Sequence, residues 1–429
     1  MDLKESLLKY LPSDEVDGLL ASLEKEEVTH ALLLNTKKMS DEEFVSRFPN
    51  VRKHPFVKHA YLYDKDEYEF GKNLLYDDGV YSIEDPSAMM VNYFLDPKPG
   101  EVILDICGAP GGKSIGASLA MEDEGLVIAN DISYPRAKAM SQNVERMGRG
   151  NMIVASNDFV FSHIHFANTF DKIILDAPCS GSAMIRKNEK AAKDWRYEKV
   201  KSCAKRQNEL LELAYSMLKE GGIISYSTCS FSYEEDEGVL LSFKEKHPEI
   251  EFVSLPDDPS FYHLKELPSA VRLHPNHFEG EGQFIALLRK PGVLTPTPKT
   301  VVSNTRYKQF LSDYGLSERS NEIMRSKFYS LSMHFDVSHL NILRYGVKLF
   351  EIREIYIPDH HLSHFLGPEY GFDLTYEECK AYISGNTFPC DKKDGFYIVT
   401  YDNQNLGYVK VVQGTAKNHY PKGLRRSID

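Results

Sequence analysis

Three segments of the chain carry residue types that can do chemistry. The segment "LDICGAPGGKS" (104–114) is rich in glycine, while "ILDAPCSGSAMIRKN" (174–188) and "ISYSTCSFSYEEDE" (224–237) each place a cysteine just after an apolar run. Glycine lets a backbone approach a bound ligand closely, and a cysteine thiolate is a strong nucleophile. The segments therefore indicate a ligand-binding loop with two thiols, Cys179 and Cys229, beside it.

The glycine-rich loop matches neither of two common nucleotide-binding fingerprints. A P-loop requires glycine five positions before Gly112, where this chain has Cys107, and a dinucleotide fingerprint starting at Gly108 requires glycine where Pro110 stands. Asp131 ends the next apolar run, "LVIAND", which suits an acid that binds a ribose hydroxyl. A loop and an acid that suit an adenosine-type ligand, without the pattern of a triphosphate-binding loop, together indicate S-adenosylmethionine. The alternative is a plain strand-to-helix turn.

Two thiols beside a methyl donor suit the methylation of cytosine at C5. That carbon is too weak a nucleophile until a thiolate adds to C6 of the ring. The C5 proton must then leave, which needs a base, and a carboxyl at the N3 edge would stabilise the charge that develops there. Cys179, Cys229 and Asp176 supply these groups, although chemistry alone does not decide which thiol attacks. For a single cysteine, the simpler interpretation is an inert, small apolar side chain.

These motifs resemble those of a known family. "LDICGAPGGKS" is similar to "DxCAAPGGKT", "DAPCSGSAMIRKN" to "DAPCSGxGxxRK" and "YSTCSFSYEEDE" to "YSTCSxxxEENE". These are motifs of the Nol/Nop/Sun family of S-adenosylmethionine-dependent RNA cytosine-C5 methyltransferases, and the chain most resembles its bacterial RsmF-like group. "YSIEDPSAMM", "RLHPNHFEGEGQFIALLRK" and "GTAKNHYPKGLR" extend the resemblance. Gly108 and Ser114 replace the usual Ala and Thr, and "LLLNTKK" resembles "RVNTLK" but lacks its arginine.

The resemblance implies a role for each matching residue. Cys229 would be the covalent nucleophile, Cys179 would help to release the methylated product, and Asp176 would contact the target base. Asp131 would bind the ribose of the cofactor, and Asp158 would lie near its adenine. The cofactor site would also include Asp176 and a loop of seven residues: Cys107, Gly108, Ala109, Pro110, Gly111, Gly112 and Lys113. No metal is expected.

Short apolar runs alternate with amphipathic segments in the scaffold that must position these residues. The expected strands are "EVILDI", "GLVIAND", "NMIVASND", "FDKIILDAP", "GGIISYSTC" and "GQFIALLRK". This alternation predicts an α/β fold with a parallel, doubly wound sheet buried on both faces. The resemblance identifies it as a Rossmann-like class I methyltransferase core. Ligands of such sheets bind outside the carboxyl ends of the strands, where both cysteines are expected.

Four regions are expected along the 429 residues. Residues 1–80 would form a small N-terminal α+β domain that binds RNA, and residues 81–290 the S-adenosylmethionine-dependent methyltransferase domain. Residues 291–305, "PGVLTPTPKTVVSNT", read as a linker. Residues 306–429 would form a C-terminal region that ends in a β-rich module, which the resemblance implies is a PUA-like RNA-binding fold.

The charge pattern indicates local RNA-binding surfaces on an acidic protein. The net charge of −12 argues mildly against a nucleic-acid partner, but residues 186–206 carry nine Lys/Arg against three Asp/Glu, and residues 409–426 carry five Lys/Arg and no acid. The alternative for the first stretch is a solvated helix face. The residues expected to contact RNA are Arg186, Lys187, Trp195, Arg196, Lys417, Lys422 and Arg425.

The remaining features predict a cytoplasmic protein without a structural metal. No run of 18 apolar residues or signal peptide is present. The six cysteines form no CxxC pair, so free thiols are expected, with Cys203 inert and no role for Cys379 and Cys390. The histidines of "PDHHLSHF" (His360, His361 and His364) are expected to be structural.

The sequence thus predicts an RNA cytosine-C5 methyltransferase whose partner is ribosomal RNA or the small ribosomal subunit, and which acts as a monomer. One alternative keeps the chemistry and takes transfer RNA as substrate. Another is a ribosome-assembly factor that binds RNA without catalysis. The presence of Cys179, Cys229 and Asp176 together argues against this last alternative.

Overall fold

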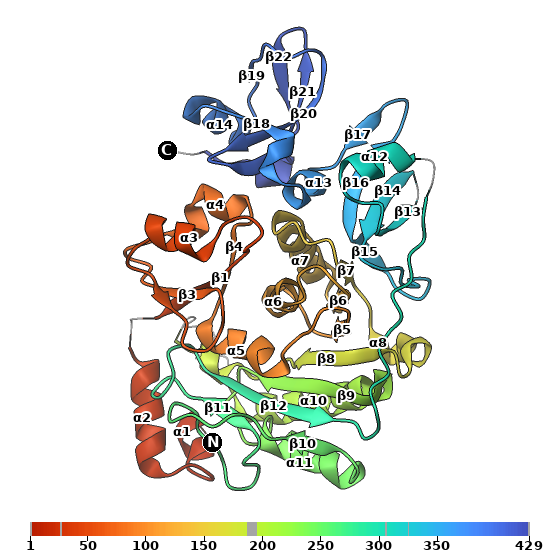
Figure 1. Cartoon of the computed structure of the whole chain (residues 1–429). Helices are drawn as coiled ribbons and strands as arrows, with labels where there is room; N and C mark the ends of the chain where they lie inside the picture. Colours follow the sequence, from red (N-terminus) through yellow and green to blue (C-terminus); the bar gives the residue numbers. More distant parts are fainter. Residues whose placement is uncertain (1, 26–27, 187–194, 305–306, 325, 428–429) are drawn as a thin grey trace.

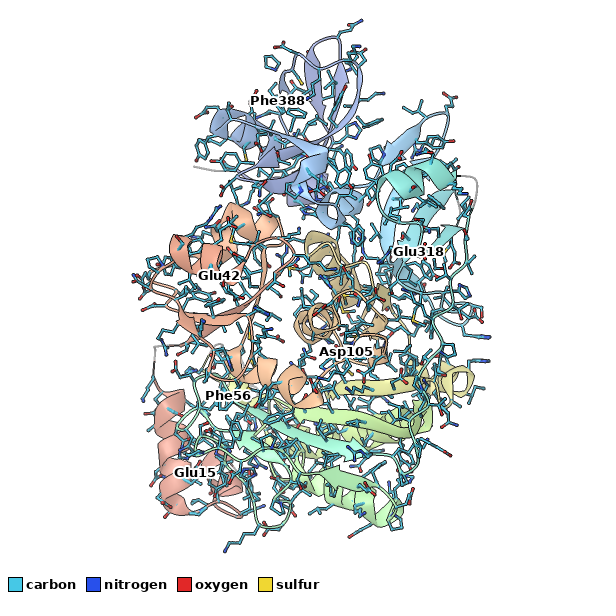
Figure 2. All side chains as sticks on the ribbon, viewed as in Figure 1. Glu15, Glu42, Phe56, Asp105, Glu318 and Phe388 are labelled. Atoms are coloured by element: carbon cyan, nitrogen blue, oxygen red, sulfur yellow. The ribbon has the colours of Figure 1, made fainter. Side chains whose placement is uncertain are left out.

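The computed structural model describes residues 2–25, 28–186, 195–304, 307–324 and 326–427 (Figure 1). A large central sheet lies between two layers of helices, and smaller sheets flank it at the two ends of the chain. Figure 2 shows Asp105 inside the central region and Phe388 in the C-terminal module.

The central sheet has the strand order β10-β12-β9-β8-β5-β6-β7-β15, with β11 paired to β12. The strands are β5 (Val102–Asp105), β6 (Leu126–Asn130), β7 (Met152–Ala155), β8 (Phe170–Asp176), β9 (Leu218–Thr228), β10 (Glu251–Val253), β11 (Val271–Leu273), β12 (Gln283–Arg289) and β15 (Ile342–Tyr345). The order reverses at β5, which has β6 on one side and β8 on the other. Such a reversal creates a crevice for ligands at the carboxyl ends of the strands.

Helices cover both faces of this sheet, as near-continuous apolar strands require. The helices are α5 (Pro86–Leu95), α6 (Gly112–Ala120), α7 (Tyr134–Arg146), α8 (Phe159–Ser162), α10 (Tyr197–Met217) and α11 (Glu237–Lys246). Ile103 packs with residues of α5, α6 and α7 on one face. Its neighbours Val102 and Leu104 pack with α10 and α11 on the other. The predicted Rossmann-like α/β core is confirmed.

Strand direction differs from the prediction at the edges of the sheet. The strands β7, β6, β5, β8 and β9 are parallel, but β12 is antiparallel to β9, β10 is antiparallel to β12, and β15 is antiparallel to β7. An apolar run such as "GQFIALLRK" is buried in either direction, so its composition could not reveal its orientation.

A small sheet near the N-terminus has the order β2-β3-β1-β4. Its elements are β1 (His30–Leu34), α3 (Asp41–Arg47), β2 (Arg52–Lys53), β3 (Ala60–Tyr63), α4 (Leu74–Asp77) and β4 (Tyr81–Glu84). Because β4 pairs with β1, this sheet extends past residue 80. The helices α1 (Leu3–Leu7) and α2 (Ser13–Leu23) pack instead against Ala183 and Phe231 of the methyltransferase core.

The C-terminal region contains two further sheets. One has the order β13-β14-β16-β17 and the other β18-β20-β21-β22-β19. Their elements are α12 (Lys308–Asp313), β13 (Ser320–Met324), β14 (Lys327–Leu331), β16 (Val347–Ile352), β17 (Tyr356–Pro358), α13 (His360–Phe365), β18 (Gly371–Asp373), α14 (Tyr376–Ile383), β19 (Phe388–Pro389), β20 (Gly395–Tyr401), β21 (Gln404–Val412) and β22 (Thr415–Asn418). Ion pairs Arg47–Asp402 and Arg426–Asp77 join the last module to the N-terminal sheet region.

Candidate active site

The glycine-rich loop lies between β5 and α6, at the point where the strand order reverses. The backbone N–H of Gly108 donates to the carbonyl of Asn130, with 2.7 Å between nitrogen and oxygen. A Cβ atom added to Gly108 would lie 3.0 Å from the carboxylate of Asp105, and one added to Gly112 would lie 2.5 Å from an oxygen of Glu84. Gly111 has φ +113°, which disfavours residues with a side chain. The glycines therefore let the loop pack closely against the carboxylates of Asp105 and Glu84, at the edge of the sheet where nucleoside-type ligands bind in such folds.

Two acids end the strands that border this loop. Asp131 follows β6, is 1% exposed, and forms an ion pair with Arg136 at 3.0 Å. Arg136 also donates to the carbonyl of Ala109 at 2.7 Å and so ties this acid to the glycine-rich loop. Asp105, at the end of β5, accepts from the hydroxyl of Ser114, and burial raises the pKa of Asp105 to about 7.

Asp158, the residue expected near the adenine, follows the next strand. Its carboxylate accepts from the backbone N–H of Val160 at 3.1 Å and caps α8. The adjacent Asn157 donates its backbone N–H to the side chain of Asn130 at 2.8 Å, which connects the ends of β6 and β7. Asp131 and Asp158 therefore follow neighbouring strands on the same edge of the sheet.

Lys113 connects the glycine-rich loop to the predicted base-contacting acid. Its ammonium lies 2.9 Å from a carboxylate oxygen of Asp176 and 3.9 Å from Glu84. Burial lowers the pKa of Lys113, but the carboxylates of Asp176 and Glu84 outweigh it and raise that pKa above its usual value. The other oxygen of Asp176 accepts from the hydroxyl of Ser227 at 2.7 Å and the amide of Gln283 at 2.9 Å. Asp176 is thus held in one orientation from three sides.

The two predicted thiols meet beyond the ends of β8 and β9. The sulfur atoms of Cys179 and Cys229 are 2.9 Å apart, both residues are half-buried, and both are free cysteines. The hydrogen bond with Cys229 and burial raise the pKa of Cys179 well above its usual value. The N–H of Ala183 donates to the carbonyl of Cys229 at 3.0 Å, so the two cysteine loops run side by side. The structure therefore brings together the two thiols and Asp176.

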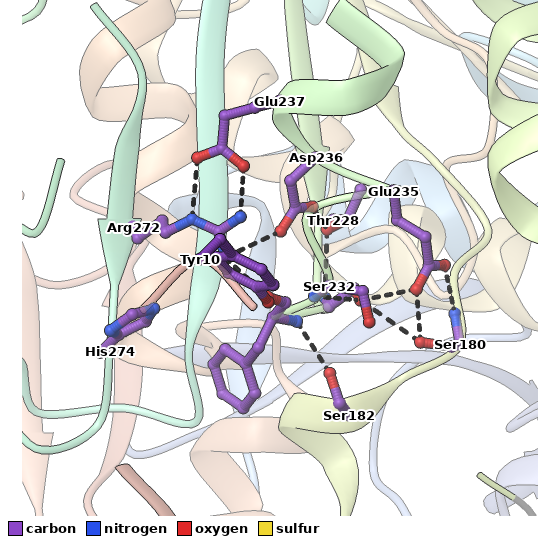
Figure 3. Close-up of polar contacts among 12 residues, drawn as sticks. Tyr10, Ser180, Ser182, Thr228, Ser232, Glu235, Asp236, Glu237, Arg272 and His274 are labelled. Atoms are coloured by element: carbon purple, nitrogen blue, oxygen red, sulfur yellow. Dashed lines mark hydrogen bonds and ion pairs between the residues drawn. The ribbon is translucent and has the colours of Figure 1, made fainter. Parts of the chain in front are cut away.

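A buried polar network supports the loop after β9 (Figure 3). Thr228, which precedes Cys229, donates its hydroxyl to Asp236 at 2.6 Å. Arg272 of β11 forms ion pairs with Asp236, at 3.1 Å, and with Glu237. Arg272 and the hydroxyl of Tyr10 both donate to the carbonyl of Phe231. The N-terminal helical segment therefore contacts the loop that carries Cys229.

The residues expected to contact RNA are placed in different surroundings. The structure corrects the expectation that Arg186 contacts RNA. Its side chain is 8% exposed and pairs with Glu281 at 3.1 Å, so Arg186 stabilises the fold beneath the surface. Lys187 lies outside the described residues. Trp195 is half-buried and its indole nitrogen is shielded from solvent, whereas Arg196 is exposed before α10. Lys417 on β22 and Lys422 are exposed; Arg425 is half-buried and donates to the carbonyl of Tyr420.

Four residues of the site were not predicted. Glu84 and Gln283 occur in "YSIEDPSAMM" and "GQFIALLRK", segments that the sequence places far from the thiols along the chain. Ser227 lies two residues before Cys229, and Glu235 lies within the same motif. All four residues lie in segments that carry the recognised motifs, and this position could have marked them as candidates. Only the folded chain shows which of the polar side chains in those segments lie at the site.

Cys203 and the three histidines of α13, the other residues that could react or bind a metal, are at least half-buried. Cys203 is half-buried on α10, and burial raises its pKa to about 11. His360, His361 and His364 are buried in α13, where the ring nitrogens of His360 and His364 lie 3.0 Å apart. Within the described ranges, no group of three or more His, Cys, Asp or Glu could hold a metal. None of the helices in the described residues is long and apolar enough to cross a membrane.

The fold and the glycine-rich loop define the class: this is an S-adenosylmethionine-dependent methyltransferase. Residues 92–289 match the family model of the 16S rRNA methyltransferase RsmB/F, and residues 370–426 match the model of the methyltransferase RsmF PUA domain. The methyltransferase core and the C-terminal module of this chain therefore match models of the RsmB/F methyltransferases and of their PUA domain.

Known relatives span almost the whole chain. "Ribosomal RNA small subunit methyltransferase F" of Citrobacter koseri is 26% identical over 96% of this chain and 93% of its own length. The protein of that name from Escherichia coli O157:H7 is 29% identical over 85% of this chain and 82% of its own length. A methyltransferase homolog protein from Pyrococcus horikoshii is 28% identical, with a TM-score of 0.58 over 67% of this chain and 93% of that chain. NSun6 from Pyrococcus horikoshii, crystallised with SFG, shares the fold at 20% identity, with a TM-score of 0.60 over 68% of this chain and 98% of that chain.

Proposed function

We propose that this protein methylates C5 of cytosine in small-subunit ribosomal RNA through a covalent cysteine adduct. The observation that carries the proposal is the contact between the thiols of Cys179 and Cys229, with Asp176 three residues before the first of them. The relatives named ribosomal RNA small subunit methyltransferase F support the choice of RNA. A substrate of this kind would place the enzyme in the cytoplasm.

The glycine-rich loop and two acids would hold the cofactor. The backbone from Cys107 to Lys113, freed of side chains at its glycines, would approach it closely, Asp131 would bind its ribose and Asp158 would lie near its adenine. When bound, S-adenosylmethionine supplies an electrophilic methyl group. Lys113 joins this loop to Asp176, so the loop that would hold the cofactor and the acid that would contact the base share one ion pair.

The two thiols and the acid would divide the work on cytosine. Cys229, as a thiolate, forms a bond to C6, and the electron pair of the C5–C6 double bond makes C5 nucleophilic. After C5 is methylated, a base takes the C5 proton, the double bond re-forms and the sulfur–C6 bond breaks, which returns Cys229 as a thiolate. Cys179 adjoins that sulfur and would assist this release, and Asp176 would contact the N3 edge of the ring.

The RNA would reach this crevice with its target base turned out of the stack. Unstacking costs a few kcal/mol and favours loosely paired sites. The exposed Lys417 and Lys422 of the PUA domain supply positive charge for the phosphate backbone.

Product analysis tests the proposal. Purified protein is incubated with methyl-labelled S-adenosylmethionine and, in separate arms, small ribosomal subunits, naked small-subunit ribosomal RNA and transfer RNA. Nucleosides are then identified by mass spectrometry. We expect labelled 5-methylcytidine from at least one ribosomal arm and none from transfer RNA. Label in transfer RNA alone would overturn the substrate, label on another nucleoside would overturn the chemistry, and RNA binding without any label would favour a role in binding only.

A further inference from the structure

The carboxylate of Glu235 accepts hydrogen bonds from residues of both cysteine loops. Glu235 is 0% exposed, and one of its carboxylate oxygens accepts from the hydroxyls of Ser180, at 2.5 Å, and Ser230, at 2.6 Å (Figure 3 shows the bonds to Ser180). Its other oxygen accepts from the backbone N–H of Ser180 at 2.7 Å. Ser180 directly follows Cys179, and Ser230 directly follows Cys229. A single carboxylate therefore connects the residues that follow the two thiols.

Neighbouring elements fix the position of this carboxylate. Gln207 of α10 donates both to Glu235, at 3.2 Å, and to the carbonyl of Pro178, at 3.1 Å. Lys199 of the same helix donates to the carbonyl of Ser180 at 3.0 Å, and the hydroxyl of Tyr226 donates to the backbone carbonyl of Glu235. The Cys179 loop is therefore attached to α10 and to Glu235 together.

A buried carboxylate such as that of Glu235 lowers the stability of the folded protein unless its partners compensate for the lost hydration. Burial raises the pKa of Glu235, while hydrogen bonds from Ser180, Ser230 and Gln207 act in the opposite direction. Among the residues that the structure describes, no lysine or arginine forms an ion pair with its side chain. A buried acid without a cation costs stability unless hydrogen bonds replace its hydration. A carboxylate, however, can accept hydrogen bonds at several sites at once, which no apolar or single-acceptor side chain can do.

We propose that Glu235 is a positioning residue that sets the separation and orientation of the Cys179 and Cys229 thiols. This inference rests on the proposed function, in which both thiols act on one cytosine. Glu235 does not touch the substrate; it acts through Ser180 and Ser230. Without it, the bonds Ala183 N–H to Cys229 O and Phe231 N–H to the Ser182 hydroxyl would still join the loops, so the fold is retained while the thiols gain freedom. A displacement of about 1 Å at reacting groups can lower turnover about 10²-fold.

The test measures the thiol pair directly, with a probe that needs neither cofactor nor RNA. Phenylarsine oxide condenses with two neighbouring thiols, forms two arsenic–sulfur bonds and releases one water. Intact-protein mass spectrometry follows its capture by the wild type, Glu235→Ala, Glu235→Gln and Ser230→Ala. Glu234→Gln is the matched control, since that neighbouring carboxylate accepts from the hydroxyl of Tyr197 on α10, whereas Ser180 and Ser230 bond to Glu235. Cys179→Ala shows which capture belongs to this pair.

We expect Glu235→Ala to capture the arsenical at least about tenfold more slowly and to lower kcat about 10²-fold, with KM and cofactor affinity within about twofold. Glu235→Gln keeps part of the hydrogen bonding and should fall between Glu235→Ala and the wild type, while Glu234→Gln should match the wild type. Ser230→Ala removes the hydrogen bond between Ser230 and Glu235 and should slow capture several-fold. In the Glu235→Ala background the same substitution should add little, because that hydrogen bond is already lost.

Capture and turnover at wild-type rates in Glu235→Ala would overturn the positioning role. If Glu235→Ala does not fold, Ser230→Ala decides: wild-type capture and turnover in that variant would equally overturn it. If the wild type methylates no RNA, the proposed function fails, but the capture rates still decide whether Glu235 positions the thiols.

Discussion

The sulfur atoms of Cys179 and Cys229 lie 2.9 Å apart, although 50 residues separate them along the chain. The parallel pairing of β8 with β9 accounts for this meeting, because it brings the carboxyl ends of the two strands to one edge of the sheet. Asp176 ends β8 and pairs with Lys113 of the glycine-rich loop, so one edge of the sheet brings together this loop, an acid and two thiols.

Lys113→Met should weaken cofactor binding about tenfold, which corresponds to about 1.4 kcal/mol. Lys113 lies 2.9 Å from Asp176 with a side chain 13% exposed, and its removal breaks the link between the glycine-rich loop and that carboxylate. Calorimetric titration with S-adenosylhomocysteine measures the change. Lys138→Met, an exposed position on α7, is the matched control and should bind as the wild type does. Equal affinity in the two variants would contradict this role.

Asp105→Asn should change how stability depends on pH. Burial raises the pKa of Asp105 in the folded protein to about 7, above its usual value of 3.8. Between these two values the unfolded chain has released the proton that the folded protein retains, so the contribution of Asp105 to wild-type stability falls as pH rises from about 4 to 7. A shift of about three units corresponds to about 4 kcal/mol. The amide variant does not show this decrease.

Urea unfolding at several pH values from 4 to 8 measures the effect. The free energy of unfolding of Asp105→Asn minus that of the wild type should increase with pH up to about 7 and then level off. Parallel curves for the two proteins would show that Asp105 titrates as an ordinary surface carboxyl.

Arg186→Ala should destabilise the fold by about 3–5 kcal/mol, because it removes the guanidinium that pairs with the buried carboxylate of Glu281. The salt dependence of RNA binding should stay unchanged, since the Arg186 guanidinium is 8% exposed. Denaturant unfolding and RNA binding at several salt concentrations measure the two effects. A normal unfolding midpoint with a shallower salt dependence would show instead that Arg186 meets phosphate.

In contrast to Arg186→Ala, the substitutions Lys417→Ala and Lys422→Ala should change the salt dependence of RNA binding and not the stability. Both side chains are exposed on the PUA domain, so stability should be nearly unchanged. Each substitution removes one cation that binds phosphate, and it should therefore reduce the slope of log affinity against log salt by about 1. The same salt titration of RNA binding measures this slope. An unchanged slope in both variants would place the RNA on another surface.

Much of the methyltransferase core could be predicted, because its strands are apolar runs and its reactive residues follow them directly. The runs that end at Asp176 and Thr228 predicted both cysteine loops, and the rule that parallel strands share one carboxyl edge predicted that they would meet. The glycine-rich loop was recognisable from its composition, and in the structure a Cβ atom at position 112 would displace the carboxylate of Glu84.

The remainder depended on contacts that sequence spacing does not encode. The antiparallel direction of β12 and the pairing of β15 with β7 are properties of the folded sheet. Arg186 occurs in a basic stretch, yet Glu281, 95 positions further along, draws it into the interior. Glu235 had no distinguishing feature within the run of consecutive acids 234–237, and only the structure shows that its carboxylate joins Ser180 to Ser230.

The capture of a covalent protein–RNA adduct tests most directly whether Cys229 attacks the target base. Wild type, Cys179→Ala, Cys229→Ala and the double variant Cys179→Ala/Cys229→Ala are incubated with S-adenosylmethionine and small-subunit ribosomal RNA, then separated on a denaturing gel that preserves thioethers. We expect Cys179→Ala to accumulate an adduct that the wild type releases and that the double variant never forms. An adduct in Cys229→Ala but not in Cys179→Ala would reverse the two roles. Methylation by the double variant would contradict covalent catalysis by these thiols.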